Sequence, residues 1–155
     1  MASKRPREAL MSLTEQEKQL IEKSIERVAD VAGDPASHVY ARLFAQQPEM
    51  EAMFVLDTDG NVRGHMLSEA LDCVFDFLGP RAYAPVLIQS ELTNHSNLGV
   101  PPAVFATFFR VVMETFRELL GAEWTAETDA AWAKLLGEFD TTIAEHAERS
   151  GLALV

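Results

Sequence analysis

Most glycine and proline residues of this 155-residue chain fall in a few short clusters, and this spacing restricts the fold more than any other sequence feature. The clusters lie at residues 33–35, 48, 60, 79–80, 85, 99–102 and 121. The long stretches between them are rich in Ala, Leu, Glu, Gln, Met and Arg, which favour helices. In no stretch do β-branched and polar residues alternate for long enough to indicate a strand. The sequence therefore predicts an all-α fold.

The helix breakers and the apolar periodicity together predict where each helix begins and ends. Residues Ser12 to Glu15 have the S-x-x-E form of a capping box, so the first helix is expected to begin there. The predicted helices span about 13–32, 36–47, 48–54, 61–78, 82–96 and 101–120. A last helix begins after Thr125 or Thr128 and runs to about 149. They form a single domain over residues 13–150, with flexible tails at 1–12 and 151–155.

The formal net charge of −11, from 13 basic and 24 acidic side chains, restricts the partners of the chain. An acidic surface repels phosphate backbones and anionic lipid, so neither nucleic acid nor a membrane is expected as a partner. No apolar run reaches the roughly 20 residues of a membrane span, and the N-terminus lacks the apolar core of a secretory signal. Cys73 is the single cysteine, which excludes an internal disulfide and an all-cysteine metal site. We therefore expect a cytoplasmic protein.

One apolar stripe in the predicted helix 61–78 determines which of its polar residues face inward. Leu67, Val74 and Leu78 recur at helical spacing on this stripe, and Arg63 lies one turn before Leu67. His65 lies about 200° around the helix from Arg63, because each residue turns an α-helix by about 100°. If Leu67 faces inward, Arg63 also faces inward and His65 faces solvent.

Four local features are candidates for a functional site: Tyr40 on an aliphatic helix face, Pro48 followed by Phe54, Arg63 on the apolar stripe, and His95 before a Gly-Val-Pro break. Each also has a purely structural explanation. A buried tyrosine usually donates to a backbone carbonyl, and an arginine near a helix start usually extends to solvent. A phenylalanine or a single histidine on an apolar face is usually part of the core. Taken one at a time, these residues leave both roles open.

Their order along the chain resembles that of the globins. The segment VYARLFAQQPEMEAMF at 39–54 resembles the globin B–C region, and RGHMLSEAL at 63–71 resembles the E helix. The segment LTNHSNLGVPPAVF at 92–105 resembles the F helix and the start of the G helix. WTAETDAAWAKLLGEF at 124–139 resembles the G–H corner and H helix of bacterial haemoglobins and neuroglobin-like chains. The resemblance covers about 13–148 and implies a 3-over-3 helical sandwich with helices A, B, C, E, F, G and H and no D helix.

The resemblance implies that the chain binds haem b, the iron protoporphyrin IX group. His95 matches the proximal ligand of the iron, and a neutral imidazole is suited to that role. Phe54 matches the ring that packs on the porphyrin. Further contacts with the cofactor are expected from Leu92, Val100 and Phe105.

On the opposite, distal side, Tyr40 matches a position whose hydroxyl can donate to a dioxygen ligand. Arg63 matches the position of the distal His or Gln, where a guanidinium can reach a haem propionate or an anionic ligand. Leu67 matches the apolar residue above the ligand. Assigning His65 as the distal residue instead would place Glu69 where an apolar residue must cover the haem.

The implied function is the binding of dioxygen and other diatomic ligands, with nitric oxide dioxygenation as a candidate reaction. No flavin or NAD domain is expected within these residues, so turnover is expected to need an external reductase. The alternative is a haem-based redox or gas sensor, or an electron-transfer globin without turnover. In that case His65 or Met66 would be a candidate sixth ligand. A homodimer is compatible with the resemblance.

Two departures from the globin pattern bear on the site. Glu91 stands one turn before His95, where a leucine commonly packs on the haem. Leu136 stands where flavohaemoglobins have a tyrosine, and their tyrosine on the G helix is missing as well. Peroxidase activity is therefore expected to be weak at most.

Overall fold

The computed structural model describes residues 13–79, 81 and 83–151, and every regular element among them is helical. The predicted tail at 1–12 and residues 152–155 of the other tail lie outside this part of the chain. The helices are α2 (Glu15–Ala32), α3 (Ala36–Gln46), α4 (Pro48–Glu51), α5 (Asn61–Leu78), α6 (Ala84–Asn97), α7 (Pro102–Leu120) and α8 (Ala126–Arg149). Two short 3-10 turns are η1 (Ala52–Phe54) and η2 (Gly121–Glu123). The all-α prediction is confirmed for the described residues.

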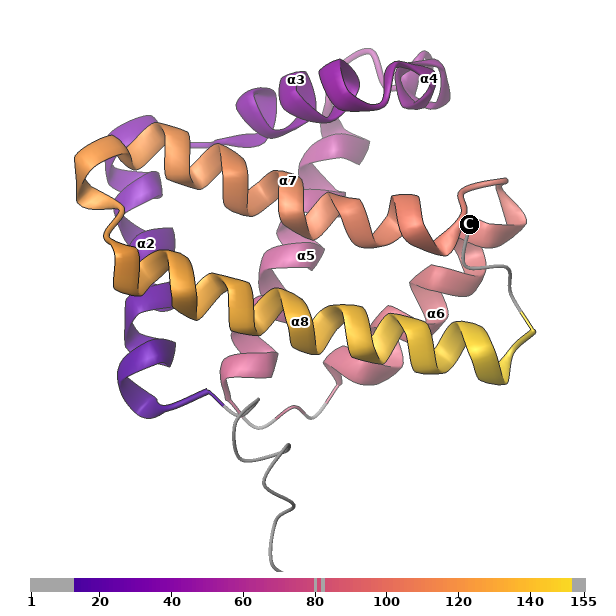
Figure 1. Ribbon diagram of the computed structural model, residues 1–155. Helices are drawn as coiled ribbons and strands as arrows, with labels where there is room; N and C mark the ends of the chain where they lie inside the picture. Colours follow the sequence, from indigo (N-terminus) through magenta and orange to yellow (C-terminus); the bar gives the residue numbers. More distant parts are fainter. Residues whose placement is uncertain (1–12, 80, 82, 152–155) are drawn as a thin grey trace, which may run out of the picture.

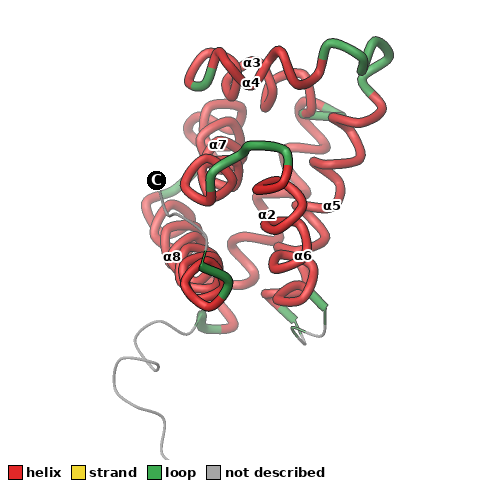
Figure 2. Tube along the Cα trace, turned by 90° about the vertical axis from the view of Figure 1, so that its right-hand side faces the viewer, coloured by secondary structure: helices red, strands yellow, loops and turns green. Residues whose placement is uncertain are grey.

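The helices form two layers, which the two ribbon views separate (Figures 1 and 2). One layer holds α7 and α8, which run side by side and are joined through η2. The other holds α5 and α6. Helix α2 packs against both α7 and α8, and α3 crosses α7 at one end. This leaves α5, α6 and α7 as three walls around one region of the interior.

Helix α2 begins two residues later than predicted. Thr14 is its N-cap: its hydroxyl accepts a 3.1 Å hydrogen bond from the Glu17 amide, and the Glu17 carboxylate accepts one of 2.9 Å from the Thr14 amide. The expected box at Ser12 and Glu15 is therefore wrong, although Ser12 itself lies outside the described residues. Both positions match the same sequence pattern, and the later start allows Leu13 to join the core, where it is buried.

The core between the layers is rich in aromatic side chains. The rings of Phe109 and Phe139 stack with centroids 4.4 Å apart, and Phe77 packs on Phe139 at 4.5 Å. The buried indole of Trp132 donates a 2.9 Å hydrogen bond to the Ser24 hydroxyl, which ties α8 to α2. These contacts hold α5, α7 and α8 at fixed distances from one another.

The connection from α5 to α6 positions the helix that carries His95. The buried Asp76 carboxylate accepts hydrogen bonds from the amides of Tyr83, at 3.2 Å, and Ala84, at 2.8 Å. It therefore provides an acceptor for two amides at the start of α6. Helix α6 begins at Ala84, whereas the sequence predicted a start near residue 82, which lies outside the described part of the chain.

Candidate functional site

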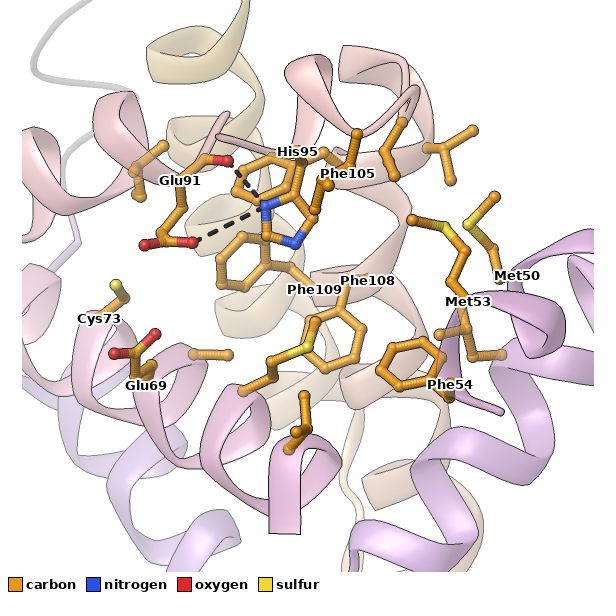
Figure 3. Close-up of a pocket in the computed structure, with 18 of the residues that line it drawn as sticks. Met50, Met53, Phe54, Glu69, Cys73, Glu91, His95, Phe105, Phe108 and Phe109 are labelled. Atoms are coloured by element: carbon orange, nitrogen blue, oxygen red, sulfur yellow. Dashed lines mark hydrogen bonds and ion pairs between the residues drawn. The ribbon is translucent and has the colours of Figure 1, made fainter. Parts of the chain in front are cut away.

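A cavity of about 330 Å³ lies among α4, η1, α5, α6 and α7. This volume is at the lower end of the roughly 300–1,000 Å³ typical of small-molecule sites. Most of the wall is apolar, with the thioethers of Met50 and Met53 and the ring of Phe54 at one end (Figure 3). Glu69 and Glu91 lie toward the other end. The cavity is thus suited to a largely apolar ligand.

His95 is the only imidazole among the described residues on the cavity wall. Its Nδ1 lies 2.7 Å from the backbone carbonyl oxygen of Glu91, one helical turn earlier. A carbonyl oxygen only accepts hydrogen bonds, so Nδ1 is the protonated nitrogen and donates. The other nitrogen, Nε2, points into the cavity (Figure 3). In the neutral Nδ1–H tautomer this nitrogen carries the lone pair that a metal would need.

The aromatic wall beside His95 comes from α7 and η1. The His95 and Phe105 rings lie 5.0 Å apart, and Phe108 and Phe109 continue the same face of α7. Val100, in the loop before α7, also lines the cavity and is buried. Phe54, Val100 and Phe105 were all expected to contact a cofactor, and the structure brings them together with His95 around one space.

Leu92, also expected to contact the cofactor, is fully buried but does not line the cavity. It packs in the core behind the wall. Around α6, Leu92 lies about 40° beyond Ile88 on the side away from Glu91, so it falls at the edge of the face that lines the cavity.

Helix α5 presents a different stripe to the cavity from the one predicted. Val62, Met66, Ala70 and Cys73 line the cavity at helical spacing. Leu67 lies on the neighbouring stripe, which packs into the core, and its exposure is 3%. It does not line the cavity, where it was expected to cover the ligand. Burial of a stripe does not distinguish the core from a cavity wall, and this is why the sequence pattern misassigned the face. The spacing of 62, 66, 70 and 73 was the signal that could have identified it.

His65 faces solvent, as predicted, with its side chain 73% exposed. Its Nε2 lies 3.1 Å from the carboxylate of Glu69, which lines the cavity. His65 itself is outside the cavity wall.

Tyr40 is buried, but it is not among the residues that line the cavity. Its hydroxyl donates a 2.9 Å hydrogen bond to the carbonyl oxygen of Arg63. Burial raises the pKa of the Tyr40 phenol well above its usual value, so the hydroxyl stays protonated. Its ring packs 5.6 Å from Phe54 and 5.7 Å from Phe108, directly behind the cavity wall. This hydrogen bond to a backbone carbonyl is the purely structural role that the sequence left open for Tyr40.

Arg63 is likewise outside the cavity wall, because its side chain is bound to Asp57. The Arg63 Nε and backbone amide each donate to Asp57 Oδ2 at 3.0 Å, and the guanidinium also donates to the Asp57 carbonyl at 2.9 Å. Asp57 Oδ1 accepts from the Val62 amide at 3.0 Å. Burial alone would raise the pKa of Asp57, but these amides and the guanidinium outweigh it and hold the pKa below its usual value. Asp57 thus caps the first turn of α5 and binds the guanidinium of Arg63.

Three acidic side chains line the cavity, and the cation that pairs with one of them, Arg63, lies outside the wall. Asp57, Glu69 and Glu91 line it, and none of the described residues on its wall is Lys or Arg. Burial, with a smaller contribution from Glu69, raises the pKa of the Cys73 thiol to about 12, so this thiol is neutral. Glu69, Cys73 and Asp57 were not predicted from the sequence to belong to the site.

Comparison with known families decides the identity of the fold. The family model of the globins matches residues 37–143, which include the cavity, His95 and both distal candidates. The chain belongs to the globin family. No match is found among curated proteins.

The described helices accordingly form the all-α globin fold that the resemblance implied. Residues 55–60, between η1 and α5, contain only turns, so no D helix is present there. Membership of this family implies the binding of haem and of small gas ligands. None of the described helices is long and apolar enough to span a bilayer.

The cavity fits a haem group on the chemistry of its donors. The described residues contain no group of three or more His, Cys, Asp or Glu side chains arranged to hold a metal ion. A metal at His95 must therefore bring most of its ligands with it, as haem iron does. A single oriented imidazole facing an apolar, aromatic space meets this requirement.

Proposed function

We propose that this globin holds haem b in the cavity through His95 Nε2 and reversibly binds a diatomic gas, dioxygen in the first place. The observation that carries the proposal is the 2.7 Å hydrogen bond from His95 Nδ1 to the Glu91 carbonyl. It holds the imidazole with Nε2 directed into the cavity, where the neutral tautomer offers its lone pair to a metal. When bound, haem supplies the iron at which gas binding takes place.

The residues around His95 would hold the cofactor and keep its surroundings dry. Phe54, Val100 and Phe105 would offer apolar surface to the macrocycle, as would Val62 and Met66 from α5. Excluding water in this way strengthens every polar interaction made with a bound ligand. It also suppresses side reactions of that ligand.

Tyr40 is the proposed hydrogen-bond donor to dioxygen. Its phenol is neutral and lies behind Phe54 and Phe108, so donation to a ligand in the cavity requires the hydroxyl to turn away from its present acceptor, the Arg63 carbonyl. A donor aimed at the partial negative charge on the ligand slows ligand release. Arg63 is not proposed as a donor to the ligand, because its ion pair with Asp57 keeps its side chain at the start of α5.

For a dioxygen-binding globin of this kind, nitric oxide dioxygenation is the proposed reaction. Dioxygen and nitric oxide combine to give nitrate, and an external reductase returns the electron that is consumed. The largely apolar lining of the cavity and the Tyr40 hydroxyl are the features of this chain that support it.

A second candidate is a redox or gas sensor, or an electron-transfer globin without turnover. One observation favours it: the thioether side chain of Met66 lines the cavity from α5, whereas His65 faces solvent. Of the two candidate sixth ligands, Met66 is therefore the one to test. If the first function holds, Met66→Leu leaves the resting absorption spectrum unchanged. Loss of low-spin bands in this variant would favour the second candidate.

The decisive experiment is the absorption spectrum of the purified protein in its ferric, dithionite-reduced and CO-bound forms. We expect a strong Soret band that His95→Ala abolishes or shifts. His65→Ala is the matched control, because it removes an exposed imidazole outside the cavity, and its spectrum should equal that of the wild type. Absence of a Soret band after haem is added would refute the proposal.

A further inference from the structure

Glu91 is the cavity residue that the gas-binding proposal leaves unexplained. It stands one turn before His95 on the cavity face of α6, where the resemblance to globins leads one to expect an apolar leucine. Its side chain is only 33% exposed. A partly buried carboxylate on an apolar wall costs solvation free energy, so its presence calls for a reason.

Both the backbone and the side chain of Glu91 face the same nitrogen atom. The Glu91 carbonyl oxygen lies 2.7 Å from His95 Nδ1, and the carboxylate oxygen Oε2 lies 3.8 Å from it (Figure 3). The apolar ring of Phe105 also packs against the imidazole, with the two ring centroids 5.0 Å apart. The Phe105 ring is uncharged, so it does not offset the negative charge that Glu91 places beside Nδ1.

This charge is not neutralised from within the cavity. The other charged side chains on the described part of its wall are Asp57 and Glu69, which are also acidic. A carboxylate close to the N–H of a metal-binding imidazole makes that imidazole a stronger electron donor. Stronger donation favours the more highly charged, ferric state of the iron.

We propose that Glu91 is a positioning residue that acts through His95. Its backbone carbonyl orients the imidazole, and its carboxylate raises the electron donation of His95 and so lowers the reduction potential of the bound iron. The inference rests on the proposed haem site at His95. In this globin, which lacks the tyrosines that flavohaemoglobins have near the proximal histidine, Glu91 of α6 is then the residue that favours the ferric form.

Glu69 provides the matched control for this idea. It lines the same cavity from α5 and carries the same charge, but its carboxylate is paired with His65 at 3.1 Å. Glu69→Gln therefore removes one negative charge from the cavity without removing a group that faces Nδ1. Glu91→Gln removes the charge that does face Nδ1 and conserves the size of the side chain.

The test uses the haem-loaded full chain and two readouts other than activity: the iron–histidine stretching frequency from resonance Raman spectra, and the midpoint potential. We expect Glu91→Gln to lower the frequency and raise the potential, while Glu69→Gln leaves the frequency unchanged and raises the potential less. Glu91→Leu should show the same lower frequency and higher potential. It replaces Glu91→Gln in the test if the Gln variant takes up haem poorly.

Equal frequencies in wild type, Glu91→Gln and Glu69→Gln would overturn the inference but leave the haem site standing. Equal potential shifts in the two Gln variants would also overturn it, because the effect would then be a general one of charge. A wild-type protein that takes up no haem would refute the proposed function itself, which separates the two failures.

Discussion

The hydroxyl of Tyr40 donates a 2.9 Å hydrogen bond to the backbone carbonyl of Arg63, which joins α3 to the first turn of α5. The amide and side chain of the same Arg63 are bound to Asp57. Two residues expected to act as separate polar groups above a ligand therefore belong to one structural link. Any role of Tyr40 toward a ligand competes with this link.

Replacing Tyr40 with Phe tests both roles of the hydroxyl. The loss of a buried hydrogen bond should lower the free energy of unfolding by about 0.5–1.5 kcal/mol, measured by urea denaturation. Dioxygen dissociation from the haem-loaded protein should also become faster, measured by stopped flow. Tyr83→Phe is the control, since Tyr83 is 44% exposed and should change neither quantity. An unchanged dissociation rate in Tyr40→Phe would leave Tyr40 with the structural role alone.

Asp57 should stabilise the fold in a pH-dependent manner. Its pKa is lower in the folded protein than the ordinary value of about 3.9. A lowered pKa means that the stabilisation is present above the ordinary value and is lost as the pH falls through the folded pKa. Asp57→Asn should therefore lower the urea midpoint at pH 7, and the difference from wild type should shrink on acidification. A difference that grows toward low pH would contradict the capping role.

The hydrogen bond between Trp132 and Ser24 predicts a loss of stability away from the cavity. Ser24→Ala leaves the indole N–H of Trp132 buried without its 2.9 Å acceptor, so unfolding should become easier by about 1–3 kcal/mol. Thr141→Ala, at an exposed position of α8, should change stability by less than about 0.5 kcal/mol. Thermal or urea unfolding measures both. Equal effects of the two variants would show that the buried bond contributes little.

The tautomer of His95 can be observed before haem is added. The Glu91 carbonyl should hold the proton on Nδ1, which long-range ¹H–¹⁵N correlation spectra of the neutral imidazole distinguish from the Nε2–H form. Because the acceptor is a backbone oxygen, the same tautomer should persist in Glu91→Leu. An Nε2–H form in the wild type would remove the main support for a ligand at this position.

The helices were largely predictable because their signals are local. The predicted range 61–78 is the observed extent of α5, and Pro102 and Gly121 bound α7 as expected for a proline in the first turn and a glycine after the last. The start of α2 was missed by two residues, because two overlapping capping patterns compete and the burial of Leu13 decides between them.

The site was predictable only in part. His95, Phe54 and Phe105 were assigned from a pattern spread over several helices, and they do surround one cavity. The wall formed by α5 was not predicted, because Leu67 and Met66 both lie on buried or half-buried faces of that helix. Their roles differ only through the helices that they face.

The sequence by itself determined the helices, their order, the family and the histidine that faces the cavity, because these depend on breakers, periodicity and spacing along the chain. The tertiary structure alone decided which stripe of α5 lines the cavity, and that Tyr40 and Arg63 bind within the protein. Adjacent residues of a helix point about 100° apart, so two neighbouring stripes are equally compatible with burial. Only the packing of α5 against the other helices selects which stripe meets the cavity.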